Sequence, residues 1–467
     1  MGCEVISMSF IFNGRNILVA GAGVTGIAVA KVLATKGAHI DFVDEKQQEV
    51  RDFKILSPDS IDVNAYSAIV VSPGWKPNHP IIVNAVKADI PIWNEIDLAW
   101  LISREITPQQ KWLALTGTNG KTTTVEMTTA MLQSAGLKAI ACGNVGETVI
   151  DAVVNAEPYD YLVLELSSFQ LHWMQEAKFT SVAILNLADD HLDWHGSFEN
   201  YCSAKFSLLE HTDIAILNAG DNEVSRRAQI WQGRKIFYSL ETPAAGELGI
   251  VEDLLIDRAF VHNPQEASMI AQISDIQPTL PHSVSNALAA AGLALSVGVS
   301  YEDIQKALIG FHPGRHRIEV VLDEDEISWI DDSKATNPHA AAASIMSHLS
   351  VIWVAGGLAK GADMNSFIDR VKTRLKAAIL IGEDRGIIEA ALHKFAPEIP
   401  IVKVDSDSIK GSSSNELMEK VVEVAKEFAK PGDTVLMAPA CASMDQFISY
   451  ADRGDRFALA VKKLVQK

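Results

Sequence analysis

The sequence predicts an α/β protein built of three consecutive α/β domains: an N-terminal Rossmann-like domain, a central P-loop ATPase-like domain and a C-terminal Rossmann-like domain. Short apolar runs that suit buried parallel strands alternate with helical segments along most of the chain. Two glycine-rich turns, at 21–26 and 117–120, each follow such a strand. The 467 residues exceed what one core usually supports, and we expect domains at 1–107, 108–313 and 314–467.

The composition narrows the class of protein. The chain has 40 basic and 59 acidic residues and a net charge of −19, which argues against a nucleic-acid or membrane partner. The apolar stretch 287–299 is too short to span a bilayer. Cys3, Cys142, Cys202 and Cys441 lie far apart, as reduced thiols of a cytosolic protein do. We therefore expect a cytoplasmic globular protein.

The first segment reads as strand, glycine turn, helix, strand and acid. A strand at 16–20 leads into Gly21-x-Gly23-x-x-Gly26, a helix runs to residue 36, and a strand at 39–43 ends in Asp44. This is the dinucleotide-binding pattern in its usual context. An NAD site is one interpretation. The segment is small, however, and its helix N-terminus suits another nucleotide diphosphate equally well.

The central segment opens on an apolar strand that runs into Gly117-x-x-Gly120-Lys121-Thr122. Backbone N–H groups of such a loop hold phosphates, the lysine adds a positive charge and the hydroxyl binds Mg²⁺. The spacing is two residues shorter than in the usual P-loop, so this is a variant. Strands are expected at 161–165, 181–185 and 214–217, small antiparallel strands within 235–283, and a helix at 285–296.

Three features of this segment are candidates for metal chemistry. Glu165 ends a strand, where an acid commonly holds Mg²⁺ beside a P-loop. His191 and His195, with three neighbouring aspartates, have a zinc-like spacing. A P-loop enzyme uses Mg²⁺, so we interpret His191 as a metal or phosphate contact and His195 as a surface or capping residue. Lys205, taken alone, reads as a solvated lysine.

The last segment repeats the α/β pattern, with strands expected at 327–330, 351–354, 378–381, 401–404 and 434–437 and a helix at 414–429. Three strings dense in polar residues, 312–317, 331–338 and 439–447, follow strands or the domain boundary. Ligands of α/β domains bind at the carboxyl ends of strands. We therefore predict that these strings are binding loops.

Four segments together resemble the Mur ligase family: 117–123, 164–171, 331–338 and 438–447, the last two being most similar to its D-glutamate-adding members. The resemblance covers residues 14–457. It implies a monomeric enzyme of bacterial peptidoglycan synthesis that uses ATP and Mg²⁺. It also implies that UDP-N-acetylmuramoyl-L-alanine and D-glutamate are joined through an acyl phosphate.

The resemblance also implies roles for individual residues. The UDP-substrate contacts are Val24, Thr25, Asp44, Glu45, Gly74 and Asn144. The ATP contacts are Gly117, Thr118, Asn119, Gly120, Lys121, Thr122, Thr123, Asn286, Arg317 and Asp332. The metal residues are Thr122, Glu165, His191 and Lys205, the last as a carbamate. The catalytic residues are Lys121, Glu165, His191, Lys205 and Arg317. The amino-acid contacts are Lys334, Thr336, Lys360, Ser443 and Tyr450, with Lys334 left between phosphate and substrate.

Two positions depart from the family pattern. Ser283 stands where an asparagine is common, which puts one adenine contact in doubt, and Tyr450 stands where we expect phenylalanine. Two other functions stay open: a folylpolyglutamate synthase, which shares the ATP loop, and a protein that hydrolyses ATP slowly as a switch. Neither explains both the N-terminal glycine turn and the three C-terminal loops.

Overall fold

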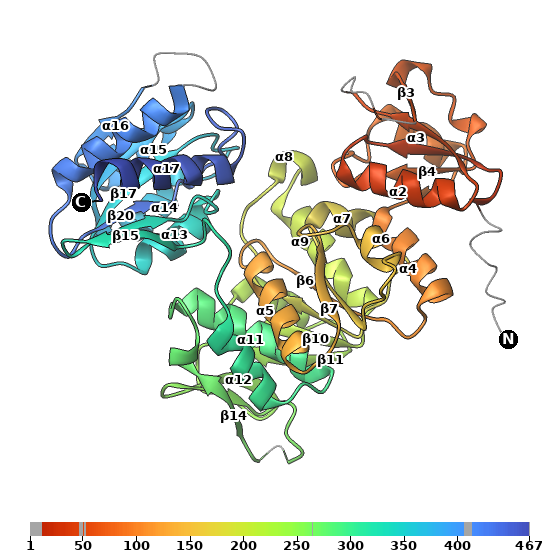
Figure 1. The fold of residues 1–467 in the computed structure, drawn as a ribbon, viewed down its shortest axis with the longest axis horizontal. Coiled ribbons are helices and arrows are strands. Elements are labelled where there is room, and N and C mark those ends of the chain that lie inside the picture. The colour runs from red at the N-terminus through yellow and green to blue at the C-terminus, as the bar shows by residue number, and fades with distance from the viewer. Residues whose placement is uncertain (1–11, 46–49, 51–52, 264, 406–412, 467) are drawn as a thin grey trace. The chain divides into compact units, whose positions relative to one another are not determined.

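The computed structural model describes residues 12–45, 50, 53–263, 265–405 and 413–466. The α/β class is confirmed, since the chain forms three sheets, each with its own helices (Figure 1). The chain divides into two compact units. Met1–Leu187, Trp194–Ile276 and Val284–Phe311 form the first, while Ala188–Asp193, Gln277–Ser283 and His312–Lys467 form the second. The predicted thiol Cys3 lies outside the described residues.

The first sheet is parallel and has the strand order β3-β2-β1-β4-β5. Its elements are β1 (Asn16–Ala20), α2 (Val24–Thr35), β2 (His39–Val43), β3 (Lys54–Leu56), β4 (Ala68–Val71), α3 (Pro80–Lys87), β5 (Ile92–Trp93) and α4 (Glu95–Ile106). The glycine turn is sterically required. A Cβ at Gly21 would lie 2.5 Å from Ser72 Oγ, and one at Gly26 would lie 1.9 Å from the Gly21 carbonyl oxygen.

The second sheet has nine strands in the order β14-β13-β12-β11-β10-β9-β6-β8-β7. Its strands are β6 (Lys111–Thr116), β7 (Ala139–Gly143), β8 (Tyr161–Glu165), β9 (Ser181–Ile184), β10 (Ile214–Asn218), β11 (Arg234–Tyr238), β12 (Glu247–Val251), β13 (Leu254–Asp257) and β14 (Ser268–Gln272). Antiparallel pairing within 235–283 is confirmed for β12, β13 and β14. It is wrong for β11, which pairs in parallel with both neighbours.

The helices that follow this sheet's strands include the one after the glycine loop. They are α5 (Lys121–Ser134), α6 (Val149–Val153), α7 (Ser168–Trp173), α8 (Leu192–His195), α9 (Phe198–Phe206), α10 (Asn222–Ala228), α11 (Pro281–Ser296) and α12 (Tyr301–Gly310). The predicted helix at 285–296 begins four residues earlier, at a proline, which is favoured in the first turn of a helix.

The third sheet has six strands in the order β15-β16-β20-β17-β18-β19, and only the edge strand β15 is antiparallel. Its elements are β15 (Glu319–Glu324), β16 (Ile327–Asp331), α13 (Pro338–Met346), β17 (Val351–Gly356), α14 (Met364–Val371), β18 (Leu375–Ile381), α15 (Arg385–Phe395), β19 (Ile401–Lys403), α16 (Ser413–Phe428), β20 (Thr434–Met437) and α17 (Tyr450–Leu464). The five predicted strands are present.

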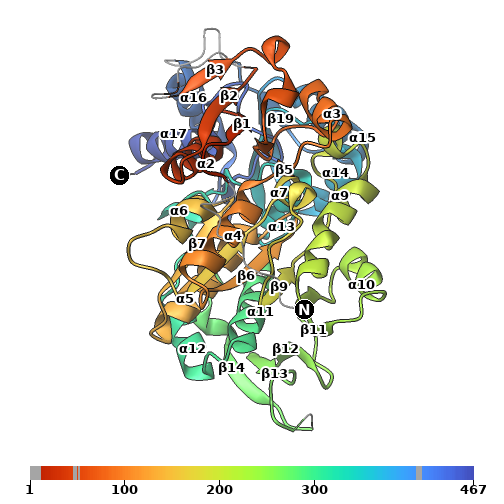
Figure 2. The same ribbon diagram turned by 90° about the vertical axis from the view of Figure 1, so that its right-hand side faces the viewer.

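Each sheet is buried on both faces, as the continuous apolar runs predict. Alternate residues of one strand belong to different cores: Leu113 and Leu115 of β6 pack in one, Trp112 and Ala114 in the other. The helices on either side of the sheets supply the rest of these cores (Figures 1 and 2). Parallel strands buried in this way place their carboxyl ends, and the loops that follow, at one edge of each sheet.

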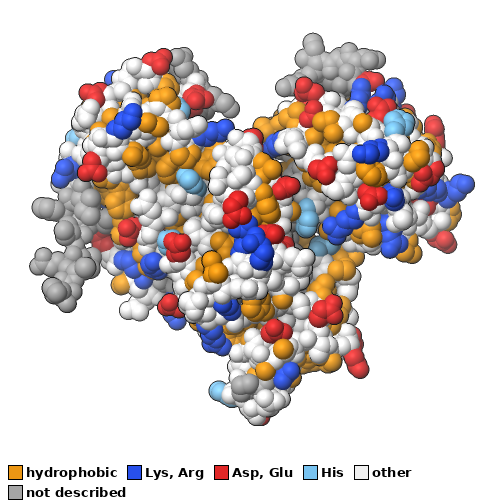
Figure 3. Space-filling model, turned by 180° about the vertical axis from the view of Figure 1, so that it is seen from behind, with side chains coloured by type: hydrophobic (Ala, Val, Ile, Leu, Met, Phe, Trp, Pro, Cys, Tyr) orange, Lys and Arg blue, Asp and Glu red, His pale blue; other side chains and the backbone are white. Residues whose placement is uncertain are grey.

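Charged side chains of both signs lie interspersed on the face drawn in Figure 3, without a band of one sign. Among the helices in the described part of the chain, none combines the length and apolar character needed to cross a bilayer.

A buried carboxyl group joins α4 to α6. Glu95 is 3% exposed, and its Oε1 accepts a hydrogen bond from the Ile150 backbone N–H at 3.1 Å. Burial raises the pKa of Glu95 to about 7, against an ordinary value of 4.5. The folded protein therefore holds this proton where the unfolded chain has lost it, and stability falls as pH rises from about 4.5 to about 7.

Glu95→Gln should remove this loss, because the amide oxygen still accepts the Ile150 hydrogen bond and carries no charge. We expect the variant to be more stable than the parent by about 1 kcal/mol or more at pH 8, with a smaller gain at pH 5. Thermal unfolding at both pH values measures this, with the exposed Glu157→Gln as control. An equal change at both pH values would contradict the prediction.

Candidate active site

The glycine loop joins β6 to α5 and has the shape of a phosphate-binding turn. Gly120 precedes α5 with φ +82°, and a Cβ there would lie 2.4 Å from Asn286 Oδ1. Only glycine fits, because the conformation is left-handed and the Asn286 amide packs directly against the loop. The structure thus brings together the loop and Asn286, two predicted ATP contacts that are distant in sequence.

Asn186, which the sequence analysis missed, holds the loop in place. Its carbonyl oxygen accepts from the Thr118 N–H at 2.9 Å, and its Oδ1 accepts from the Asn119 N–H at 2.8 Å. Its Nδ2 donates to the Asn119 carbonyl oxygen at 3.0 Å. The available signal was its position just after β9, next to β6 in the sheet.

Oxygen-bearing side chains gather beside the loop. Thr122 Oγ1 donates to Glu165 Oε2 at 2.7 Å, and Asn144 Nδ2 donates to Glu165 Oε1 at 2.8 Å. Glu165 is 2% exposed. A buried carboxylate beside a hydroxyl is the oxygen donor set that Mg²⁺ prefers, so Thr122 and Glu165 fit the metal that a P-loop enzyme uses. Lys121 Nζ donates to the Thr118 carbonyl oxygen at 2.8 Å.

Lys205 is not the solvated lysine that its chemistry alone suggested. Lys205 is 2% exposed, and its Nζ donates to the Gly117 carbonyl oxygen at 2.8 Å and to Thr116 Oγ1 at 3.2 Å. The ammonium also lies over the Tyr201 ring, 4.8 Å from its centroid. The fold buries Lys205 because α9 packs under the loop, which one sequence without contacts does not reveal.

The two histidines of the 189–195 string have different environments. His195 is 8% exposed and bonds Ser168 Oγ through Nε2 at 2.9 Å, so the expectation of a surface residue is wrong. His191 belongs to the segment 188–193, which groups with the second unit. It has φ +52°, and its Nε2 lies 3.6 Å from Asp190 Oδ2.

The first unit holds a pocket of ≈ 440 Å³ next to the glycine turn at 21–26. Three of the predicted UDP-substrate residues line it: Asp44, Glu45 and Gly74, together with Trp75 and His79. Asp44 Oδ2 also accepts from the Ala22 N–H at 2.7 Å, which joins the pocket to the turn before α2. Val24 and Thr25 lie in the first turn of α2 and do not line this pocket.

Three predicted loops of the C-terminal unit meet at one edge of its sheet. The loop after β20 bonds the loop after β17 through the Leu358 and Ala442 backbones, at 2.9 and 3.0 Å. It also bonds the loop after β16, where the Ala440 N–H donates to the Ala335 carbonyl oxygen at 3.0 Å. The predicted amino-acid contacts Thr336, Lys360 and Ser443 therefore lie on three adjacent loops.

Three further predicted residues, Asp332, Lys334 and Tyr450, belong to the same unit. The Lys334 ammonium lies over the Tyr450 ring, 3.9 Å from its centroid. Asp332 is 8% exposed, and burial raises the pKa of its carboxyl to about 7. The positive charge of the nearby Arg317 lowers this pKa and so opposes the effect of burial. Because the Asp332 carboxyl is easily protonated, it is better suited to act as a hydrogen-bond partner than as a permanent negative charge.

Comparison with known proteins identifies the family. The Mur ligase middle domain matches residues 115–294, and the Mur ligase glutamate ligase domain matches residues 316–441. A curated UDP-N-acetylmuramoylalanine–D-glutamate ligase of Streptomyces coelicolor is 44% identical, covering 97% of this chain and 99% of its own. The chain belongs to the Mur ligase family. This Mur ligase is an ATP-dependent enzyme that forms an amide bond, in peptidoglycan synthesis.

Further relatives agree. The enzyme of the same name from Thermobifida fusca is 43% identical over 97% of this chain and 99% of its own. Among solved structures, a pseudomurein peptide ligase type C from Methanothermus fervidus matches with TM-score 0.60 at 18% identity, over 96% and 99% of the two chains. The UDP-N-acetylmuramate–alanine ligase of Thermotoga maritima matches with TM-score 0.58 at 18% identity, over the same shares. At these identities the structures support the fold of this Mur ligase alone.

Proposed function

We propose that this Mur ligase joins D-glutamate to UDP-N-acetylmuramoyl-L-alanine at the expense of ATP, as the curated relatives are named for doing. The observation that carries the proposal is the meeting of three strand-end loops in the C-terminal unit. Thr336, Lys360 and Ser443 bring two hydroxyls and an ammonium to one edge of the sheet. A dicarboxylate amino acid needs such cationic and hydroxyl donors for its two anionic groups.

In the first step, a carboxylate oxygen of the UDP-substrate attacks the γ-phosphorus of ATP. The bond to the β,γ-bridging oxygen breaks, ADP leaves, and an acyl phosphate forms. Two anions must approach each other, so the enzyme's help is mainly electrostatic. Lys121 and Arg317 supply positive charge to the transferred phosphoryl group. Thr122, Glu165 and His191 would hold Mg²⁺, which when bound neutralises phosphate charge.

In the second step, the D-glutamate amine attacks the acyl carbon. The carbon–oxygen bond breaks, inorganic phosphate leaves, and the nitrogen loses a proton as the amide forms. The amino-acid contacts must hold both carboxylates while the nitrogen points at the acyl carbon, which is a problem of positioning. The loops around Lys334, Thr336, Lys360, Ser443 and Tyr450 perform it in this proposal.

The remaining assignments belong to the same proposal. Val24, Thr25, Asp44, Glu45 and Gly74 bind the UDP part at the glycine turn, whose helix N-terminus favours a diphosphate. Asn144 contacts the substrate beside Glu165. Asn286 and Asp332 contact the nucleotide, and Lys205 carries a carbamate that serves the metal. The enzyme acts as a cytoplasmic monomer, with no nucleic-acid or membrane partner, and has domain boundaries near 107 and 313.

Phosphate release measured with ATP, Mg²⁺ and a panel of carboxylate and amino-acid substrates tests the proposal. We expect release only when UDP-N-acetylmuramoyl-L-alanine and D-glutamate are both present. Release with a folate and L-glutamate would favour a folylpolyglutamate synthase instead. Release with ATP alone, unaffected by either substrate, would favour a nucleotide switch.

Ser443→Ala should raise the KM for D-glutamate about tenfold or more, because a hydrogen bond to a carboxylate contributes roughly 1.5–3 kcal/mol. The KM values for ATP and the UDP-substrate should change little, since the contact concerns only the amino acid. Steady-state kinetics measures all three, with Ser366→Ala on the exposed face of α14 as control. An unchanged KM for D-glutamate would mean that the Ser443 hydroxyl does not contact this substrate.

A further inference from the structure

Arg453 of α17 is a fully buried guanidinium that no motif of the sequence singled out. Its Nε donates to Ser333 Oγ at 2.9 Å and its Nη2 to the Ser333 carbonyl oxygen at 3.0 Å. Its Nη1 reaches the Gly356 carbonyl oxygen at 3.3 Å, and both Nη atoms reach the Cys441 carbonyl oxygen at 3.2 Å. All of these acceptors are neutral oxygens.

The three acceptor residues stand at the ends of three adjacent strands. Ser333 follows β16, Gly356 ends β17 and Cys441 follows β20, and β20 lies between the other two in the sheet. These are the loops on which Lys334, Thr336, Lys360 and Ser443 stand. The planar fork of the Arg453 guanidinium therefore bonds to all three of these strand ends, within four residues of Lys334, Thr336, Lys360 and Ser443.

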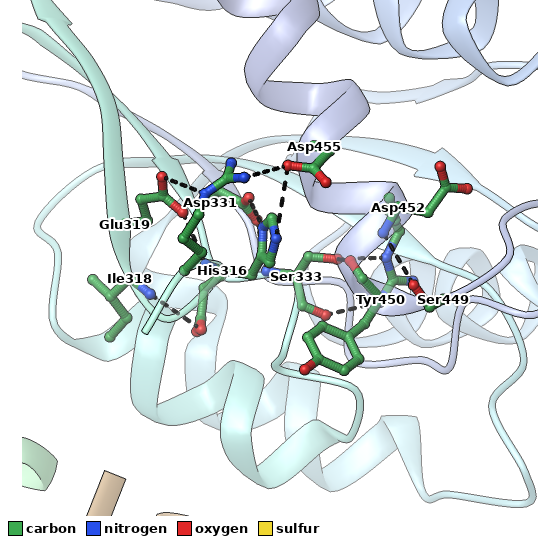
Figure 4. A network of polar contacts seen from close by, with 12 residues as sticks. His316, Ile318, Glu319, Asp331, Ser333, Ser449, Tyr450, Asp452 and Asp455 are labelled. Atoms are coloured by element: carbon green, nitrogen blue, oxygen red, sulfur yellow. Dashed lines mark hydrogen bonds and ion pairs between the residues drawn. The ribbon is translucent and has the colours of Figure 1, made fainter. Parts of the chain in front are cut away.

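A second buried network fixes the helix that carries this fork. His316 Nδ1 bonds Asp331 Oδ2 at 2.7 Å, and the Ser333 N–H donates to Asp331 Oδ1 at 2.9 Å (Figure 4). A Cβ at Gly454 would lie 2.3 Å from His316 Nδ1, so α17 packs directly on this pair. The Ser333 hydroxyl also donates to the Tyr450 carbonyl oxygen at 2.8 Å. Arg453 therefore cannot shift without disturbing its surroundings.

Burying the Arg453 charge costs free energy, so a role in filling space alone does not explain why an arginine stands at this position. Burial lowers the pKa of Arg453 to about 10, and the side chain still stays protonated at neutral pH. Replacing a buried charged group by a well-packed apolar one is often neutral or stabilising. A guanidinium in this place adds what an apolar side chain lacks, namely hydrogen bonds that set the spacing of three backbones.

We propose that Arg453 is a positioning residue for the amino-acid substrate: it holds the loops after β16, β17 and β20 at the spacing that lets their donors reach both carboxylates of D-glutamate at once. It does so through three backbone carbonyl groups and the Ser333 hydroxyl, and it does not contact the substrate. The inference rests on the proposed function, because it takes these loops as the amino-acid pocket.

Arg453→Lys tests the proposal. Lysine keeps the charge, but its single ammonium cannot reach carbonyl groups on three loops in the geometry of the fork. We expect the KM for D-glutamate to rise about tenfold or more, with the KM values for ATP and the UDP-substrate within about twofold of the parent. Arg456→Lys is the matched control on the same helix, where Arg456 pairs with Asp452 at 2.8 Å near the surface. It should leave all three values unchanged.

A folded Arg453→Lys with a lower melting temperature and an unchanged KM for D-glutamate would overturn the proposal, and so would an equal rise of all three KM values. If Arg453→Lys does not fold, Ser333→Ala removes one acceptor and should raise only the KM for D-glutamate, by about threefold. No rise in a folded Ser333→Ala would overturn the proposal too. Failure of the proposed function is distinguishable, because the parent enzyme itself would then not respond to D-glutamate.

Discussion

Lys121→Ala is expected to abolish turnover while leaving the protein folded. In the structure Lys121 Nζ bonds the Thr118 carbonyl oxygen at 2.8 Å, so the ammonium already lies over the loop that is proposed to hold phosphate. Its charge matters most when the γ-phosphoryl group moves between two anions. Loss of such stabilisation costs on the order of 3 kcal/mol or more, which is a rate reduction of about 100-fold or more.

Phosphate release under saturating substrates measures this effect, and circular dichroism with thermal unfolding checks the fold. Lys138→Ala provides the matched control, because Lys138 is an exposed lysine of the same unit that pairs only loosely with Glu157, at 4.0 Å. Release near the parent rate from a folded Lys121→Ala would mean that the glycine loop does not serve ATP.

Lys205→Ala should also lose most of its activity, by about 100-fold, since residues that support a metal site commonly cost 10–100-fold when removed. The structure gives two possible causes. The ammonium caps the Gly117 carbonyl oxygen at 2.8 Å, and the proposed carbamate would add carboxylate oxygens at the metal. Rescue separates them, because formate or acetate can replace missing oxygens and cannot replace a donor to a carbonyl group.

We therefore expect partial recovery of Lys205→Ala with formate or acetate, and dependence of the parent enzyme on bicarbonate. Lys205→Met, which fills the space that alanine leaves, should be inactive and should respond less to added carboxylates. If no carboxylate rescues an inactive Lys205→Ala and bicarbonate does not affect the parent enzyme, the carbamate proposal is contradicted. Lys205 would then act only through its hydrogen bond to the Gly117 carbonyl oxygen of the loop.

The sequence predicted best what short segments determine. The turn at Gly21 and Gly26 and the loop at Gly117 and Gly120 each follow a strand directly, and Gly21 and Gly120 have positive φ, so these glycine motifs are visible in the sequence. The same holds for the strands of all three sheets with continuous apolar runs. The strands β3, β5, β7 and β15 were missed, because short or partly exposed strands have weaker apolar runs.

Residues whose environment depends on distant contacts could not be predicted. Asn186 forms hydrogen bonds with a loop residue 67 positions earlier in the chain, and Arg453 donates to Ser333, which lies 120 positions earlier. Lys205 and His195 were expected to be exposed because their side chains are polar, yet helix packing buries both. A single sequence does not show contacts between distant positions or the packing of helices. Of these residues, only Asn186 offered a signal, its position just after β9, and together they shape the site.

The most direct test of the proposed function is the mass of the product. The enzyme is incubated with ATP, Mg²⁺ and UDP-N-acetylmuramoyl-L-alanine, together with D-glutamate, L-glutamate, L-lysine or diaminopimelate. We expect a product with the mass of the amide between UDP-N-acetylmuramoyl-L-alanine and D-glutamate, with one ADP formed per amide, and no product with the other amino acids. An equal amount of product with L-glutamate, L-lysine or diaminopimelate would contradict the proposed selectivity for D-glutamate. Formation of ADP without any amide would contradict the proposed ligase reaction.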